Sequence, residues 1–168
     1  MLGFTIPEVD KLLEPYAKKS YDKYINEYYD ITCVWTKHLL GSEEQENIAR
    51  NYALKKVERD LEQGFQSWEY RFNTLGSSRG DYPFITITLG NLNTLFGKMI
   101  SIAALNVRKN GQGKDGFKKP VLFPKIVFLY DENLHGEGKE MEDVFNAGIE
   151  CSSKSMYPKQ LGLFTVMC

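Results

Sequence analysis

The sequence has few of the features that mark membrane, secreted and metal-binding proteins. No apolar run approaches the roughly 18 residues that a membrane-spanning helix needs, and the first residues lack the basic segment and long apolar core of a signal peptide. The three cysteines (Cys33, Cys151 and Cys168) and the two histidines (His38 and His135) lie far apart, without metal-ligand spacing. We therefore expect a cytoplasmic protein that binds no metal through this chain and has no disulfide framework.

The sequence also lacks a strong excess of charge of either sign. A net charge of −1 gives no reason to expect a nucleic acid or a membrane surface as a partner. The loop at 77–83 contains neither of the familiar phosphate-binding spacings, G-x-x-x-x-G-K-[ST] or G-x-G-x-x-G. A hydrophobic content of 42%, with ten Phe and ten Tyr, is nevertheless enough to bury a core. The length of 168 residues fits one domain or a piece of a larger one.

Two long helices are predicted in the first half of the chain. Thr5-Ile6-Pro7-Glu8 has the pattern of a capping box and predicts a helix to about Tyr29, which Pro15 would kink or divide. A second capping box, Ser42-Glu43-Glu44-Gln45, precedes a helix of about thirty residues. Its length favours a helical hairpin or a dimer interface, and Gly64 would let another helix approach closely. One apolar stripe runs along it: Leu54, Val57, Leu61, Phe65, Trp68, Phe72 and Leu75.

The second half of the chain is predicted to alternate strands and helices. The pattern predicts strands over 84–89 and 121–130 and helices over 95–108 and 139–153, the last of them ended by Met156-Tyr157-Pro158. This is a βαβα unit with a parallel sheet. A sheet of two parallel strands cannot cover both its faces or its edges. The chain is therefore expected to be a slice of a larger α/β sheet or barrel.

The junction between the second long helix and the strand at 84–89 is the first candidate site. Residues Ser77 to Pro83 combine short hydroxyls, glycine and proline, and such a loop can bind a phosphate or a nucleotide through backbone amides and hydroxyl groups. The alternative is an ordinary turn in which Gly76 and Gly80 supply positive φ and Asp81 caps the chain. The residues alone leave both alternatives open.

Three further features have a functional and a structural interpretation. Gly111 to Gly116 has the composition of an anion cradle, but a flexible solvated loop is favoured. Asp131-Glu132 follows a strand, where catalytic groups occur, yet paired carboxylates are also common in turns. Cys151 has Lys154 nearby, as a reactive thiol requires, whereas a buried structural cysteine is the simpler interpretation.

Four blocks resemble one protein family in order and separation. They are QGFQSWEY at 63–70, NTLGSSRGDYPFITITLG at 73–90, KPVLFPKIVF at 119–128 and CSSKSMYP at 151–158. On these residues the chain, from about Phe4 to Tyr157, resembles the anaerobic (class III, glycyl-radical) ribonucleoside-triphosphate reductases. The resemblance implies an internal segment of a ten-stranded α/β barrel. Residues 1–75 would form a helical layer near a dimer contact, and 76–168 the βαβα portion of the barrel.

The resemblance also implies a reaction and partners. Enzymes of this family reduce ribonucleoside triphosphates to 2′-deoxyribonucleoside triphosphates for DNA synthesis, by glycyl and thiyl radical chemistry. It implies nucleoside triphosphates as substrates and effectors, a homodimer, and an activating enzyme of the radical-SAM class. The full-length family uses a glycyl radical, a structural zinc and nucleotide effectors, and we expect this chain itself to bind no cofactor.

By the same resemblance, specific residues are expected at the site. The loop between the effector site and the substrate would be Ser77, Ser78, Arg79, Gly80, Asp81, Tyr82, Pro83 and Phe84, with Thr86, Thr88 and Lys125 facing the pocket. No catalytic residue is assigned: Cys168 follows a methionine but lacks the Met-Gly-Cys context of the thiyl cysteine, so we expect no turnover by this chain alone. The alternatives are a non-catalytic dimerisation or regulatory module and a stand-alone nucleotide-binding α/β protein.

Overall fold

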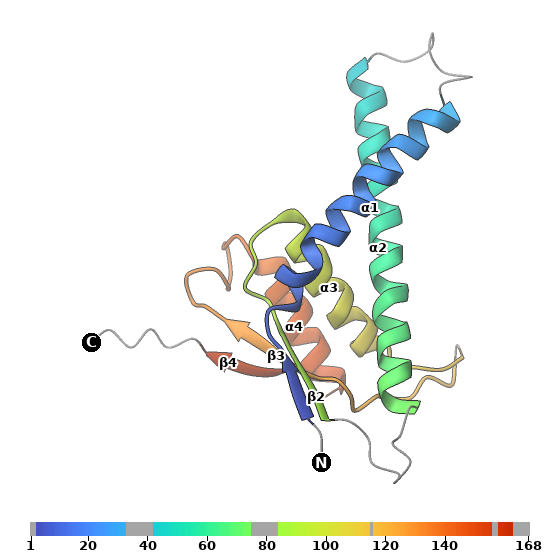
Figure 1. The fold of residues 1–168 in the computed structure, drawn as a ribbon. Helices are drawn as coiled ribbons and strands as arrows, with labels where there is room; N and C mark the ends of the chain where they lie inside the picture. The colour runs from blue at the N-terminus through green and yellow to red at the C-terminus, as the bar shows by residue number, and fades with distance from the viewer. Residues whose placement is uncertain (1–2, 33–41, 75–83, 115, 156–157, 163–168) are drawn as a thin grey trace.

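The computed structural model describes residues 3–32, 42–74, 84–114, 116–155 and 158–162, which form an α/β structure (Figure 1). Its elements are β1 (Gly3–Ile6), α1 (Val9–Thr32), α2 (Ser42–Thr74), β2 (Phe84–Leu89), α3 (Leu95–Asn110), β3 (Lys125–Tyr130), α4 (Glu142–Ser155) and β4 (Lys159–Gly162). The strands form one sheet in the order β1-β2-β3-β4, and every neighbouring pair is parallel. The α/β class is confirmed.

The helices cover one face of this sheet. In Figure 1, α3 and α4 lie behind the strands. The residues that alternate toward this face are buried in the core: Ile85, Ile87 and Leu89 of β2, and Ile126 and Phe128 of β3. When parallel strands follow one another in sequence order, right-handed crossovers place all the connecting helices on the same side. The other face carries Thr86 and Thr88, which are only half-buried.

α1 and α2 pack as a helical hairpin that extends well beyond the sheet (Figure 1). Five of the seven residues of the predicted stripe on α2 are confirmed, because Val57 and Phe65 are buried and Leu61, Trp68 and Phe72 pack against the core. Leu54 is not part of this cluster, and Leu75 lies outside the described residues. The prediction for Gly64 is wrong. A Cβ added at this position would meet no heavy atom within 4 Å, so no described element approaches the glycine.

The predicted capping box at Thr5 is wrong, because this segment forms a strand. Thr5 lies in β1 opposite Thr86, and α1 begins at Val9, where the Leu12 amide donates to the Glu8 carbonyl at 3.0 Å. The local capping pattern is overridden by backbone pairing with a strand some eighty residues away. β1 comes from the part of the chain predicted to be wholly helical. α1 then continues through Pro15 as one helix.

The βαβα prediction omits two strands and misplaces the starts of β3 and α4. β3 begins at Lys125 rather than Val121, since Pro124 has no N–H to donate to a ladder. α4 begins at Glu142 rather than Lys139. β4, which pairs with β3 from Lys159 opposite Val127, was not predicted. The expected two-stranded sheet is therefore four-stranded. None of the described helices has the length and apolarity that crossing a bilayer requires.

Candidate functional site

The predicted loop residues Ser77 to Pro83 lie outside the described residues. Phe84, which follows them, is the first residue of β2 and is exposed. Its ring meets that of Phe123 edge-to-face at 5.3 Å, and the Lys125 ammonium lies 5.7 Å from the ring centroid. The structure therefore brings Phe84 and Lys125 together at the amino end of the strands. This small cluster offers an aromatic surface and a positive charge.

The predicted pocket residues lie on the sheet face that the helices leave open. Thr86 stands between Thr5 and Lys125 in the strand register, so these three residues share the open face. Thr88 lies on the same face, two residues further along β2. Its hydroxyl oxygen accepts a hydrogen bond from the Glu8 amide at 2.7 Å, while its own proton can still be donated.

A buried carboxylate that sequence reasoning missed lies at the carboxyl ends of the strands. Asp10, in the first turn of α1, is 1% exposed. Its Oδ2 accepts from the backbone amides of Gly90, Asn91 and Leu92 at 2.9, 3.2 and 3.3 Å. The Ser101 hydroxyl lies 3.5 Å from the same oxygen. These amides belong to the loop after β2, so Asp10 fixes that loop from the helix that follows β1.

A buried histidine fixes the same loop from the other side. The Nε2 of His135, which is 1% exposed, lies 2.7 Å from the Gly90 carbonyl oxygen. Because a carbonyl only accepts, Nε2 carries a proton and donates it. Nδ1 lies 3.0 Å from both the amide nitrogen and the carbonyl oxygen of Asp131. The ring is packed against Phe128 and Tyr130, at 5.1 and 5.6 Å.

We call Asp10, Gly90 and His135 the carboxyl-edge clamp. Gly90 donates its backbone N–H to Asp10, and its carbonyl oxygen accepts a hydrogen bond from His135, so both of its backbone polar groups are engaged. Gly90 has φ 103°, and a Cβ there would lie 2.7 Å from Phe128 Cε2, so only glycine fits. The clamp thus connects the start of α1, which follows β1, with the loops that follow β2 and β3, at the edge where α/β proteins bind ligands.

Asp131, the first of the paired acids at the end of β3, closes a turn in the structure. Asp131 accepts the Asn133 amide on Oδ1 at 2.8 Å, and its carbonyl accepts the amides of Leu134 and His135 at 3.1 and 2.9 Å. This is an ordinary turn closed by an Asx-type contact. Asp131 contributes to the site through its backbone, which contacts His135.

The amino ends of β2 and β3 lie near a buried ion pair that sequence reasoning also missed. Arg108 Nε lies 2.6 Å from Glu69 Oε1, and the two residues are 1% and 3% exposed. The guanidinium also donates to the carbonyls of Pro124 and Val121 at 2.6 and 3.3 Å. Burial raises the pKa of the Glu69 carboxyl, and the Arg108 charge acts in the opposite direction. The pair connects α2, α3 and the segment before β3.

The glycine-rich stretch after α3 is anchored to this ion pair. Gln112 and Lys119 exchange backbone hydrogen bonds of 2.9 and 2.8 Å, and the Gln112 side chain donates to the Gln66 carbonyl at 3.1 Å and lies 3.4 Å from Glu69 Oε2. The base of the stretch is therefore held in place, whereas Phe117, between Gln112 and Lys119, is 82% exposed. None of the described contacts in this stretch forms an anion cradle.

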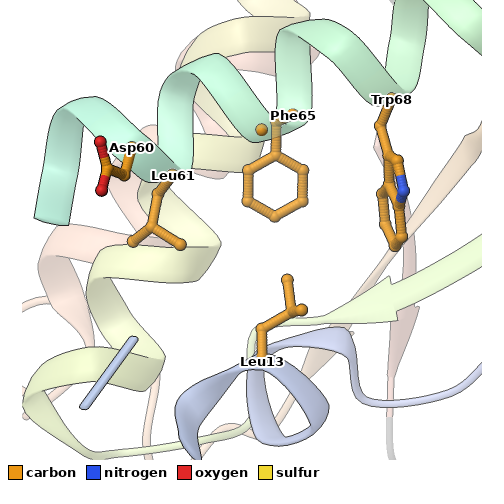
Figure 2. Close-up of a pocket in the computed structure, with 6 residues that line it drawn as sticks. Leu13, Asp60, Leu61, Phe65 and Trp68 are labelled. Atoms are coloured by element: carbon orange, nitrogen blue, oxygen red, sulfur yellow. The ribbon is translucent and has the colours of Figure 1, made fainter. Parts of the chain in front are cut away.

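An apolar pocket of about 240 Å³ lies between α1 and α2. Figure 2 shows Leu13 of α1 pointing toward Phe65 of α2, with Leu61 and Trp68 on either side. Asp60 at its edge accepts a hydrogen bond from the Tyr24 hydroxyl. That hydrogen bond, followed by burial, raises the pKa of Tyr24 to about 12. The pocket suits apolar side chains rather than a phosphate.

Cys151 is confirmed as a buried structural cysteine. It is fully buried, its sulfur lies 3.5 Å from the Ser155 hydroxyl, and burial raises the pKa of its thiol. Across the described part of the chain, no three His, Cys, Asp or Glu side chains gather as a metal site would require.

The sequence is similar to one enzyme family over nearly its whole length. Residues 3–166 match the family described as anaerobic ribonucleoside-triphosphate reductase. The anaerobic ribonucleoside-triphosphate reductase of Enterobacteria phage T4 is 38% identical over 158 residues, which are 93% of this chain and 24% of that protein. Its namesakes from Haemophilus influenzae and Escherichia coli are 35% and 32% identical over 157 and 159 residues, again 93% of this chain and 20% of each relative. This chain, which spans between a fifth and a quarter of these relatives' length, belongs to the anaerobic ribonucleoside-triphosphate reductase family.

Proposed function

We propose that this chain is a segment of an enzyme that reduces ribonucleoside triphosphates to 2′-deoxyribonucleoside triphosphates for DNA synthesis. The match of residues 3–166 to the reductase family is the observation that carries the proposal. The relatives named as this reductase cover the same 93% of the chain. A regulatory module or a stand-alone nucleotide-binding protein would give no reason for such a match.

The segment contributes part of a ten-stranded α/β barrel in this proposal. Four parallel strands in sequence order, with helices on one face, are the arrangement from which a barrel wall is built. The helix-covered face then becomes the outside of the barrel, and the face with Thr86 and Lys125 becomes its interior. Strands from the rest of the protein would pair with β1 and β4 and remove the sheet edges.

Within that barrel, the open face and the preceding loop meet the nucleotides. The proposed loop between effector and substrate is Ser77 to Phe84, with Thr86, Thr88 and Lys125 facing the substrate. The Lys125 ammonium beside the Phe84 ring supports this assignment, since a triphosphate needs cations and a base can stack on an aromatic ring. The glycyl radical, the structural zinc and the site for the radical-SAM activating enzyme belong to other parts of the protein in this proposal.

The enzyme is proposed to act as a homodimer that uses the α1–α2 hairpin. The pocket around Leu13 is apolar, and Leu12 and Tyr16 on the same helix are 54% and 68% exposed. Replacing Tyr16 by Arg in the full-length protein should weaken the dimer, as measured by sedimentation equilibrium. Ile31→Arg, on an equally exposed apolar residue near the far end of α1, is the matched control. Equal effects of the two variants would refute this interface.

Anaerobic turnover of the activated full-length protein tests the proposed activity. We expect conversion of labelled ribonucleoside triphosphate to its 2′-deoxy product, and a kcat/KM at least about tenfold lower for Lys125→Ala, because a charge-assisted phosphate contact is lost. Lys154→Ala, on an exposed lysine of α4, should leave kcat/KM unchanged. A wild-type protein that forms no deoxynucleotide would refute the proposal.

A further inference from the structure

We propose that Asp10 and His135 are positioning residues, which fix the loop at Gly90–Asn93 where it contacts the ribonucleotide. This inference rests on the proposed function and assigns a role to the carboxyl-edge clamp. The loop follows β2 directly, at the carboxyl ends of the parallel strands. Enzymes with parallel α/β barrels place their substrate contacts at this edge.

The clamp acts on the backbone of three successive residues, Gly90 to Leu92. Asp10 accepts the N–H groups of three successive residues from Gly90, and His135 donates to the Gly90 carbonyl. Asp10 reaches this loop from the first turn of α1, which follows β1, and His135 reaches it from the loop after β3. Neither partner can move without breaking hydrogen bonds that are buried from water, which is costly. The loop is therefore fixed relative to three strands at once.

The chemistry of Asp10 is unusual for a group that serves stability alone. Its buried carboxylate accepts backbone and hydroxyl hydrogen bonds, and no ion pair with it occurs in the described part of the chain. Burying a charge without a counter-ion carries a desolvation cost, and apolar side chains stabilise a core at least as well. A carboxylate is, however, able to order three consecutive amides with one oxygen atom. This is what accurate placement of a loop requires.

The loop also retains one polar group whose partner is absent from the described residues. Asn91 Oδ1 is buried and has no hydrogen-bond donor among them. The Asn91 amide is meanwhile held by Asp10 at 3.2 Å. Because buried acceptors are normally satisfied, the donor is expected to come from outside the described residues. The clamp thus holds in place a loop in which the Asn91 side-chain oxygen can accept one more hydrogen bond.

Two substitutions of His135 separate positioning from packing. In His135→Gln, the side-chain amide can reach the place of Nε2 and donate to Gly90, whereas in His135→Asn it reaches only the place of Nδ1. Both variants remove the same aromatic ring from the contacts with Phe128 and Tyr130. A packing role therefore predicts similar losses, while a positioning role predicts different ones.

The test is ribonucleoside triphosphate binding to the full-length protein by equilibrium dialysis, without turnover. We expect a Kd within about threefold of wild type for His135→Gln and at least about tenfold weaker for His135→Asn and Asp10→Asn. Lys154→Ala, on an exposed lysine of α4, is the control and should bind like wild type. Hydrogen exchange should quicken at the amides of 90–92 in Asp10→Asn, with the amides of β3 still protected.

The possible failures are distinguishable. Equal binding by His135→Gln and His135→Asn, or an equal loss in Lys154→Ala, would overturn the positioning role while wild-type binding upholds the proposed function. Unchanged exchange at 90–92 in Asp10→Asn would overturn it too, even if that variant is less stable. A full-length wild-type protein that binds no ribonucleoside triphosphate would overturn the proposed function itself, and the inference with it.

Discussion

The two ends of the sheet are held by buried polar groups of different kinds. At the carboxyl end, the Asp10 carboxylate and the His135 ring bind the backbone of one loop. At the amino end, Glu69 and Arg108 form an ion pair, and Arg108 also binds two carbonyls of the segment before β3. Both sets are almost fully buried. The buried polar groups at the carboxyl end thus hold a loop in place, whereas those at the amino end pair two opposite charges.

This difference has a physical consequence for substitution. Removing one member of a buried ion pair leaves an uncompensated charge, whereas removing an acceptor of backbone N–H groups frees a loop that can move toward water. We therefore expect changes at the amino end to act mainly on the stability of the whole structure. Changes at the carboxyl end should act mainly on the local order of residues 90–93.

The largest effect is expected for Arg108→Met. This variant leaves Glu69 buried and unpaired, and should lower the free energy of unfolding by about 3–5 kcal/mol. Thermal and urea unfolding measure the loss. The double variant Glu69→Met with Arg108→Met removes both charges and should recover most of it, since apolar replacements of both partners are often neutral. A double variant as unstable as Arg108→Met would contradict this account of the amino end.

Gly90→Ala should have the next largest effect, at the carboxyl end. Gly90 has φ 103°, and the added Cβ would lie 2.7 Å from Phe128 Cε2. We expect a loss of about 1–3 kcal/mol in the free energy of unfolding, from backbone strain and displacement of the ring. Gly116→Ala is a control for the strain alone, because its φ is 84° but its Cβ would meet nothing within 4 Å. If both variants lose the same amount, the contact with Phe128 has no role.

Gly64→Ala should have a smaller effect of opposite sign. This glycine is inside α2, and the added methyl group would enter open space beside the apolar pocket. Alanine is favoured over glycine in a helix by up to about 1 kcal/mol. Urea unfolding should therefore show a gain in stability, in contrast to the loss at Gly90. A loss would mean that the pocket is occupied by a part of the protein outside the described residues.

Local patterns predicted the long elements and failed for the short ones. β2 was predicted with its observed ends and α2 over nearly its full length, since the apolar period is visible within each segment. β1 and β4 have four residues each and exist through pairing with distant strands. In the Thr5 segment, a strand of this kind overrode a capping pattern that is sound locally.

The buried site residues were missed for a related reason. Asp10 contacts Gly90 across 80 positions and His135 contacts Gly90 across 45. Neither residue belongs to a short motif, so only the fold brings them together. Family resemblance, in contrast, identified the family from its four blocks. The loop at Ser77 to Pro83 stays a prediction, because it lies outside the described residues.

The last cysteine prediction concerns the burial of Cys151, which is tested by chemical labelling. The raised pKa of this thiol has little effect on stability near neutral pH. Its raised pKa keeps the thiol protonated, so iodoacetamide at pH 8 should label it far more slowly than a free peptide thiol. Any stabilisation from this shift is present below the ordinary thiol pKa and is lost as the pH rises through the folded value. Peptide mapping by mass spectrometry identifies the labelled cysteine. Rapid labelling of Cys151 in the folded protein would contradict its burial.

A third polar contact lies away from both ends of the sheet, in the α1–α2 hairpin. Tyr24 and Asp60 form a hydrogen bond between α1 and α2, and this bond, with burial, raises the pKa of Tyr24 to about 12. The neutral hydroxyl is the form that the folded state favours, so the contribution to stability is present below the ordinary pKa of 10.0 and is lost as the pH rises toward about 12.

In Asp60→Asn the carboxylate is gone, and the pKa of Tyr24 should return toward its ordinary value. A spectrophotometric titration of phenolate absorbance, compared between wild type and Asp60→Asn with Tyr16→Phe as a control on an exposed tyrosine of the same helix, measures this shift. If the titration curve is the same with and without the Asp60 carboxylate, burial alone accounts for the raised value. The Tyr24–Asp60 contact would then contribute little to the hairpin, unlike the buried polar groups at either end of the sheet.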